Sequence, residues 1–175
     1  MKRFVGSKKR ILNVGCGSDT YGTHFVDLYP TRKEVVKCNV DEERLPFRSN
    51  FFDEVYSKNL LEHLRNPSFC LKEMKRVLKK GGELVIITDN ASYWVWAVGK
   101  THHGGYSSGF SEDKHYSIYL PEHLVNHLKK LGFRRIRFDF ILDSDNFLIK
   151  MIDKFLSLTP LRRLGFKRFK IVALK

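Results

Sequence analysis

The feature that most constrains the fold is a short apolar run that leads into a glycine turn. Residues 11–14 (ILNV) are predicted to form a strand, followed by Gly15-Cys16-Gly17 and then by a second short strand that ends at Asp27. The glycines lack a Cβ atom, so the backbone can turn sharply and approach a ligand closely. Open α/β sheets hold a nucleoside with such a loop and with an acid at the tip of the next strand. We therefore predict a nucleoside site here, with a plain structural turn as the alternative.

The loop departs from the pattern that binds dinucleotides. That pattern is G-x-G-x-x-G, with an acid about 20 residues further along the chain. Here Thr20 stands where the third glycine would be, and Asp27 comes too early. A different nucleoside is therefore favoured.

Length and composition indicate one globular domain, residues 1–175, whose apolar fraction of 42% argues against disorder. No apolar run reaches the roughly 18 residues that a membrane span needs. The first ten residues are basic but lack the apolar segment of a signal peptide. The three cysteines lack metal-ligand spacing, so we expect reduced thiols and a cytoplasmic protein.

The net charge of +13 is large for a chain of 175 residues. A protein this basic attracts polyanions such as RNA or anionic lipid. Basic side chains also simply keep small proteins soluble, so charge alone leaves the partner open.

Strands alternate with helices along the chain, which predicts an α/β fold. We expect a Rossmann-like, mostly parallel sheet of about seven strands. The expected strands are 11–14, 25–27, 34–40, 52–57, 83–88, 134–142 and 169–174, and the expected helices are 67–80, ended by Gly81-Gly82, and 121–131.

The first three strands are joined by links that have no room for a helix. Crossovers between parallel strands usually need a dozen or more residues. One face of the sheet should therefore be short of helical cover. The apolar helix predicted at 147–156 would pack there, or a second subunit would, which makes a homodimer one expectation.

Four further segments carry a family resemblance. They are DEERLPF at 41–47, FFDEV at 51–55, LEHL at 61–64 and RVLKKGGEL at 76–84. In their order and spacing these segments resemble those of class I S-adenosylmethionine-dependent methyltransferases. The resemblance runs from Ile11 to about Thr88 and is weaker beyond. The short first loop is similar to that of a compact, type 11-like subgroup, often associated with glycan or cell-envelope chemistry.

The resemblance implies S-adenosylmethionine as cofactor, with S-adenosylhomocysteine as product. Asp27 would accept the ribose hydroxyls, and Asp41 the adenine amino group, next to the backbone N–H of Glu42. For both acids a turn or cap carboxylate is the alternative. The remaining cofactor-binding residues that it implies are Asn13, Gly15, Cys16, Gly17, Asp19, Leu28, Ser57, Lys58 and Asn59.

The loop differs from the family in two places. Many members have an acid where Asn13 stands and a glycine where Asp19 stands. Asn13 carries no charge to pair with the cofactor's ammonium, so Asp19 or a backbone carbonyl would do so. Cys16 is expected to contribute backbone only, because no histidine or lysine lies near it in sequence to lower its pKa.

A long connection at about 90–119 follows the fifth strand and is rich in Tyr, Trp, His and Gly. Connections this long are usually functional or disordered. We expect a lid over the acceptor, with His115 or His103 as a general base; ordinary packing with a mobile tip is the alternative. An apolar, basic helix at about 146–165 follows later in the chain.

Glu62-His63 is similar to a segment that binds a divalent metal in some relatives. One acid and one histidine are too few ligands, because Asn59 stands where a second carboxylate would be. We predict no metal and a hydrogen-bonded structural histidine.

The predicted function is methyl transfer from S-adenosylmethionine to a small-molecule or glycan-type acceptor by in-line displacement. Methylation of RNA or another nucleic acid is the alternative that the charge favours. A non-catalytic cofactor-binding domain is a third interpretation. The apolar and basic C-terminal segment would in addition rest on an anionic membrane.

Overall fold

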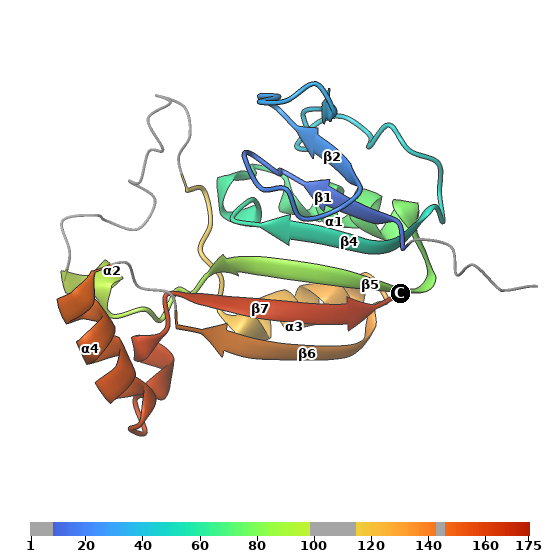
Figure 1. Cartoon of the computed structure of the whole chain (residues 1–175). Helices are drawn as coiled ribbons and strands as arrows, with labels where there is room; N and C mark the ends of the chain where they lie inside the picture. Colours follow the sequence, from blue (N-terminus) through green and yellow to red (C-terminus); the bar gives the residue numbers. More distant parts are fainter. Residues whose placement is uncertain (1–8, 99–114, 143–145) are drawn as a thin grey trace, which may run out of the picture.

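The computed structural model describes residues 9–98, 115–142 and 146–175. Seven strands form one sheet in the order β3-β2-β1-β4-β5-β7-β6 (Figure 1). Neighbouring strands are parallel except at β7, which runs antiparallel to β5 and β6. The strands are β1 (Ile11–Val14), β2 (His24–Asp27), β3 (Val35–Lys37), β4 (Phe52–Lys58), β5 (Leu78–Asp89), β6 (Arg134–Ile141) and β7 (Arg168–Leu174). This confirms the predicted Rossmann-like, mostly parallel sheet.

The strand order reverses between β1 and β4. In open α/β sheets, ligands bind outside the carboxyl ends of the strands at this reversal. The helices are η1 (Leu61–His63), α1 (Pro67–Val77), α2 (Val95–Val98), α3 (Pro121–Lys130), α4 (Phe147–Ser157) and η2 (Arg162–Gly165), where η marks a 3-10 helix.

One side of the sheet carries both long covering helices. Leu71 and Met74 of α1 and Leu124 and Leu128 of α3 are fully buried in one core with the strands. In Figure 1, α1 and α3 both lie behind the sheet, and the front carries no helix in the described part of the chain. The short links between β1, β2 and β3 explain the reduced cover, because neither link contains a helix.

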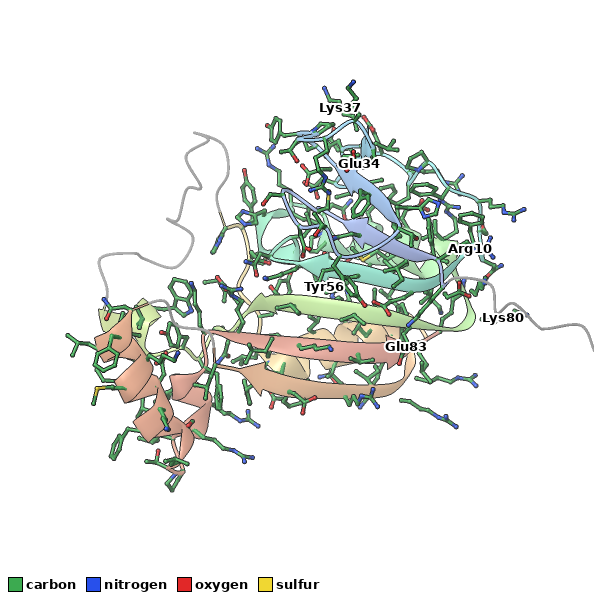
Figure 2. All side chains as sticks on the ribbon, in the orientation of Figure 1. Arg10, Glu34, Lys37, Tyr56, Lys80 and Glu83 are labelled. Atoms are coloured by element: carbon green, nitrogen blue, oxygen red, sulfur yellow. The ribbon has the colours of Figure 1, made fainter. Side chains whose placement is uncertain are left out.

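The front face is polar enough to need little cover. Tyr21, in the loop after β1, packs its ring 4.6 Å from that of Tyr56, and its hydroxyl donates to Glu54 at 2.7 Å. Lys9 pairs with Glu54 at 2.7 Å and with Glu83 at 3.8 Å. Figure 2 shows Tyr56 and Glu83 on this face of β4 and β5. Polar side chains alternate with buried ones along these strands, so less apolar surface is left to bury.

The expectation that the helix at 147–156 covers this face is wrong. α4 lies beyond the carboxyl end of β5, beside α2 and η2 (Figure 1). Its buried residue is Asp153, which accepts hydrogen bonds from Tyr93 and Trp94. A hydrogen-bonded carboxylate, and not the apolar stripe, therefore fixes where this helix docks.

The predicted end of the first long helix is also wrong. α1 begins at Pro67, after the cap residue Asn66, and ends at Val77, because Leu78 is extended (φ −71°, ψ 137°) and pairs with Phe52. The next residue, Lys79, forms an ion pair with Asp53. Gly81 and Gly82 consequently lie inside β5. Leu78 buries its side chain completely as a strand residue, which helical periodicity cannot indicate.

The third strand is shorter than the predicted 34–40. After Lys37 the chain turns, and the backbone N–H groups of Glu42 and Glu43 donate to the carbonyl of Asn39. No helix in the described ranges is long and apolar enough to span a bilayer. All three cysteines are buried free thiols.

Candidate functional site

The loop after β1 needs glycine at its first position. Gly15 has φ +67°, and a Cβ atom there would lie 2.6 Å from Cδ1 of Leu60, which follows β4. Its N–H donates to the carbonyl of Val26 at 2.9 Å, which holds the loop against β2. Both the backbone conformation and the close approach of Leu60 exclude a side chain.

Asp27 joins the end of β2 to this loop. Its Oδ2 accepts the N–H of Gly17 at 2.7 Å, and its Oδ1 accepts the N–H of Tyr29 at 2.8 Å. An ionised carboxylate has about four acceptor positions, so both oxygens keep capacity for a ligand. The turn role and the ligand role are thus compatible at Asp27.

A first cavity of about 550 Å³ opens beside Asp27. Its walls come from the loop after β1 and from the segments that follow β2, β3 and β4. The residues that line it are Gly15, Gly17, Asp27, Leu28, Tyr29, Thr31, Asn39, Val40, Asp41, Glu42, Asn59, Leu60, His63, Leu64, Arg65 and Tyr116.

Asp41 lines the first cavity and also holds the chain in place before α1. Its carboxylate accepts the N–H of Asn66 at 2.7 Å and that of Arg65 at 3.0 Å, immediately before α1. This is the cap role that was the alternative for this residue. Asp41 nevertheless lines the first cavity next to Glu42.

A second cavity, of about 1000 Å³, adjoins the first and shares four lining residues with it, Gly15, Gly17, Asn59 and His63. More charged side chains line it than line the first cavity. Its other lining residues are Asn13, Cys16, Ser18, Asp19, Lys58, Glu62, Asp89, Tyr93, Val95, Trp96, His115, Asn146, Ile149, Lys167 and Arg168.

Asn13, Asp19 and Cys16 line the second cavity. Asn13 donates from Nδ2 to the carbonyl of Tyr21 at 2.9 Å, and Asp19 accepts the N–H of Tyr21 at 2.8 Å. Burial raises the pKa of the Cys16 thiol to about 11, so it stays protonated at neutral pH. The two polar side chains therefore order the loop, and Cys16 offers no thiolate.

Glu62 lines the second cavity, and the pKa of its carboxyl group is shifted far from its usual value. It is 1% exposed, and its Oε2 accepts the hydroxyl of Thr88 at 2.8 Å. Burial, together with the nearby negative charge of Asp89, raises its pKa to about 7. Sequence reasoning singled this residue out only as an incomplete metal ligand. Within the described ranges, no group of three His, Cys, Asp or Glu residues is placed to hold a metal ion.

His115 lies at the second cavity and meets His63 edge to face, with ring centroids 4.7 Å apart. The neighbouring N–H of Tyr116 donates to the carbonyl of Glu62 at 2.7 Å, so the end of the long connection is tied to η1. His103 and most of the predicted lid lie outside the described residues.

The predicted cofactor residues after β2 and β4 divide between the cavities. Leu28 lines the first cavity, Lys58 lines the second and Asn59 lines both. Ser57 is buried within β4, and among the residues described it lines neither of these two cavities. In the second cavity, the lining residues that the sequence did not indicate include four from the C-terminal part, namely Asn146, Ile149, Lys167 and Arg168. Lys167 and Arg168 reach this cavity because β7 pairs with β5, where Arg168 lies opposite Asp89, whereas Asn146 and Ile149 reach it with α4.

Comparisons with known proteins agree with this architecture. The family described as "Methyltransferase domain" matches residues 23–86. An uncharacterised protein of Methanocaldococcus jannaschii is 29% identical over 88% of this chain and 75% of its own length. A tRNA U34 carboxymethyltransferase of Psychrobacter cryohalolentis is 36% identical over 50% of this chain, but this covers only 21% of that protein.

Two solved structures show the same fold. A methyltransferase of Thermotoga maritima, described as a possible histamine N-methyltransferase, has a TM-score of 0.66 at 17% identity, covering 96% of this chain and 83% of that one. A phosphoethanolamine N-methyltransferase of Haemonchus contortus in complex with S-adenosylmethionine has a TM-score of 0.61 at 18% identity, covering 95% of this chain and 48% of that one.

The sheet order, the glycine loop and the cavity at the strand reversal define a Rossmann-like methyltransferase domain. Residues 23–86 match the methyltransferase-domain family, and the described chain has the fold of solved S-adenosylmethionine-dependent methyltransferases. An S-adenosylmethionine-dependent methyltransferase is the class of enzyme that this match and this fold indicate.

Proposed function

We propose that the chain methylates a small-molecule or glycan-type acceptor bound in the second cavity. The observation that carries the proposal is that this cavity, of about 1000 Å³, adjoins the first at the glycine loop. Small-molecule sites in proteins have volumes of about 300–1,000 Å³. Two adjoining cavities suit a donor and an acceptor that must meet at one point.

In this proposal the donor's nucleoside occupies the first cavity. Asp27 would accept the ribose hydroxyls with the acceptor positions that its two backbone contacts leave open. Asp41 and the backbone of Glu42 would meet the adenine, and Asn13 and Asp19 would face the methionine end. The glycine loop leaves room for such a group, because Gly15 and Gly17 line the cavity without side chains.

The cofactor supplies a methyl group that is already activated on a sulfonium. The protein's residues therefore need only orient the acceptor, exclude water and, for a protonated nucleophile, take up a proton. His115 lines the second cavity in contact with His63, which supports this last role for it. We assign it as the general base.

Aromatic side chains favour a sugar or another flat, partly apolar acceptor. Tyr93 donates its hydroxyl to Asp153, and Trp96 donates its indole N–H to the carbonyl of Asn90. Their polar atoms are thus engaged within the protein, so their ring atoms are what they offer a ligand.

Methylation of RNA is the second candidate. It is favoured by the net charge of +13 and by the similarity to tRNA U34 carboxymethyltransferases. For either acceptor, a cytoplasmic location and the division into one domain with a lid remain predictions.

The test is transfer of a labelled methyl group from S-adenosylmethionine into a fractionated cell extract. We expect label in soluble small molecules or glycans, and its loss in the His115→Ala variant, which should keep normal affinity for S-adenosylhomocysteine. Label confined to RNA would overturn the proposal in favour of the second candidate. Full turnover by His115→Ala on the true acceptor would remove the base assignment alone.

A further inference from the structure

The outer surface of α4 and η2 has a composition that methyl transfer does not explain. Three side chains of α4 are largely exposed, Phe147 at 75%, Leu148 at 69% and Phe155 at 68%. With about 100° between successive helical residues, Met151 and Ile152 fall in the same sector, about 140° wide. The exposed apolar side chains of this surface are Phe147, Leu148, Met151, Ile152, Phe155, Leu158 and Leu161.

Fixed contacts on the opposite side of α4 hold this stripe outward. Asp153 is 1% exposed and accepts hydrogen bonds from Tyr93 at 3.0 Å and Trp94 at 2.8 Å. Gly165 of η2 packs so closely that a Cβ atom there would lie 2.5 Å from the carbonyl oxygen of Asp153. The helix cannot turn its apolar side inward without breaking these contacts.

Positive charges border the stripe. Lys150, Lys154 and Arg162 are exposed and form no ion pair within the described part of the chain. Arg163 pairs with Glu122 at 2.6 Å. The sole acid between residues 146 and 167 is Asp153, which is buried and hydrogen-bonded. The surface therefore combines exposed apolar rings with positive charge that no neighbouring acid offsets.

We propose that this surface binds the anionic headgroup region of a lipid bilayer, with α4 lying in the plane of the interface. Helices with aromatic and aliphatic residues on one face and lysine or arginine beside it bind membranes in this way. The basic side chains would meet lipid phosphates while the stripe enters the boundary of the acyl chains. α4, with 11 residues, is too short to cross a bilayer.

Charge selects lipid over a second copy of the chain. Two copies that met through this stripe around a two-fold axis would bring the same basic residues together. Lysine is also depleted at interfaces between proteins. An anionic bilayer instead supplies the opposite charge along the whole border.

This inference goes beyond the proposed function and does not depend on it. It has a consequence for access to the site, because Asn146 and Ile149, at the start of α4, line the second cavity. Docking through α4 would place that cavity beside the lipid surface.

The test is flotation of the full chain with phosphatidylcholine vesicles, with and without phosphatidylglycerol. We expect binding to the anionic vesicles that weakens as salt rises. Each lysine or arginine near an anionic surface contributes about fivefold to the binding constant. Lys150→Glu/Lys154→Glu should therefore weaken binding by more than about tenfold. Phe147→Ser/Phe155→Ser should also release the protein, and both pairs are exposed enough to leave the fold intact.

The matched control is Lys129→Glu/Lys130→Glu, which makes the same charge change at the exposed end of α3. We expect it to float as the unchanged protein does. Equal loss in this control, or no flotation on anionic vesicles at low salt, would overturn the proposal. A dimer that Phe147→Ser/Phe155→Ser converts to a monomer, without any lipid binding, would assign the surface to a second copy instead.

Discussion

The hydroxyl of Thr88, near the end of β5, donates a 2.8 Å hydrogen bond to Oε2 of Glu62 in η1. Glu62 is buried and its pKa is raised to about 7, mainly by that burial. In the unfolded chain a glutamate ionises near pH 4.3. Between about pH 4 and 7 the folded protein thus holds a proton that the unfolded chain has lost, so stability falls as pH rises.

Glu62→Gln should reduce the loss of stability that accompanies rising pH. The glutamine keeps an oxygen for Thr88 but does not titrate. The free energy of unfolding of the variant, relative to that of the unchanged protein, should therefore rise by about 3 kcal/mol from pH 4 to 8. Urea unfolding across this range at constant ionic strength measures the free energy of unfolding. The exposed Glu34→Gln serves as control, and its curve should run parallel to that of the unchanged protein. A parallel curve for Glu62→Gln would show that Glu62 ionises normally.

Gly15→Ala should weaken donor binding and the fold together. The new Cβ atom would lie 2.6 Å from Leu60 Cδ1, and alanine at φ +67° is strained, so a loss of about 2 kcal/mol is expected. Thermal unfolding and calorimetry with S-adenosylhomocysteine measure the two effects.

A second glycine separates the two causes. Gly81 has φ +74° with nothing within 4 Å of a Cβ atom, so Gly81→Ala should cost only the strain of about 1 kcal/mol. Adding Leu60→Ala should rescue part of the loss at Gly15 and nothing at Gly81. Absence of coupling between the changes at 15 and 60 would rule out the collision.

Asp27→Asn should abolish tight donor binding. The substitution places an amide nitrogen where one of the two carboxylate oxygens now accepts an N–H, from Gly17 or Tyr29. Loss of charge-assisted hydrogen bonds of this kind costs about 3 kcal/mol, or about a hundredfold in affinity. Calorimetry with S-adenosylhomocysteine measures it, and Asp139→Asn, on the exposed side of β6, is the control. Unchanged affinity of Asp27→Asn would transfer the ribose role to another residue.

The residues that line the first cavity, where the nucleoside is proposed to bind, were predictable because their signals are local. The glycines at 15 and 17 and the acids at 27 and 41 each follow a short strand, and the carboxyl ends of parallel strands meet at one edge of a sheet. No side-chain contact across the fold was needed to place them.

The walls of the second cavity, the proposed acceptor site, were not predictable in the same way. Arg168 reaches the cavity because β7 inserts antiparallel between β5 and β6 and pairs Arg168 with Asp89, far away in sequence. The position of α4 was missed because an apolar stripe ordinarily indicates burial. Here the helix docks instead through one buried carboxylate, that of Asp153. The hydrogen-bond partners of Asp153, Tyr93 and Trp94, lie about 60 residues earlier in the sequence.

Asp153→Ala should loosen α4 and disturb the acceptor side of the site. The change leaves the Tyr93 hydroxyl and the Trp94 indole N–H without their acceptor, at a cost of about 3 kcal/mol. Because Tyr93 lines the second cavity, we expect a higher KM for the acceptor and an unchanged Kd for S-adenosylhomocysteine, which would bind in the first. Hydrogen exchange should rise across 147–157 while β4 and β5 stay protected. Asp153→Asn keeps one acceptor oxygen, so its KM and exchange rates should lie between those of the unchanged protein and of Asp153→Ala. The exposed Lys154→Ala should change neither KM nor the exchange rates. Slow exchange of α4 in Asp153→Ala would mean that packing against η2 alone fixes the helix.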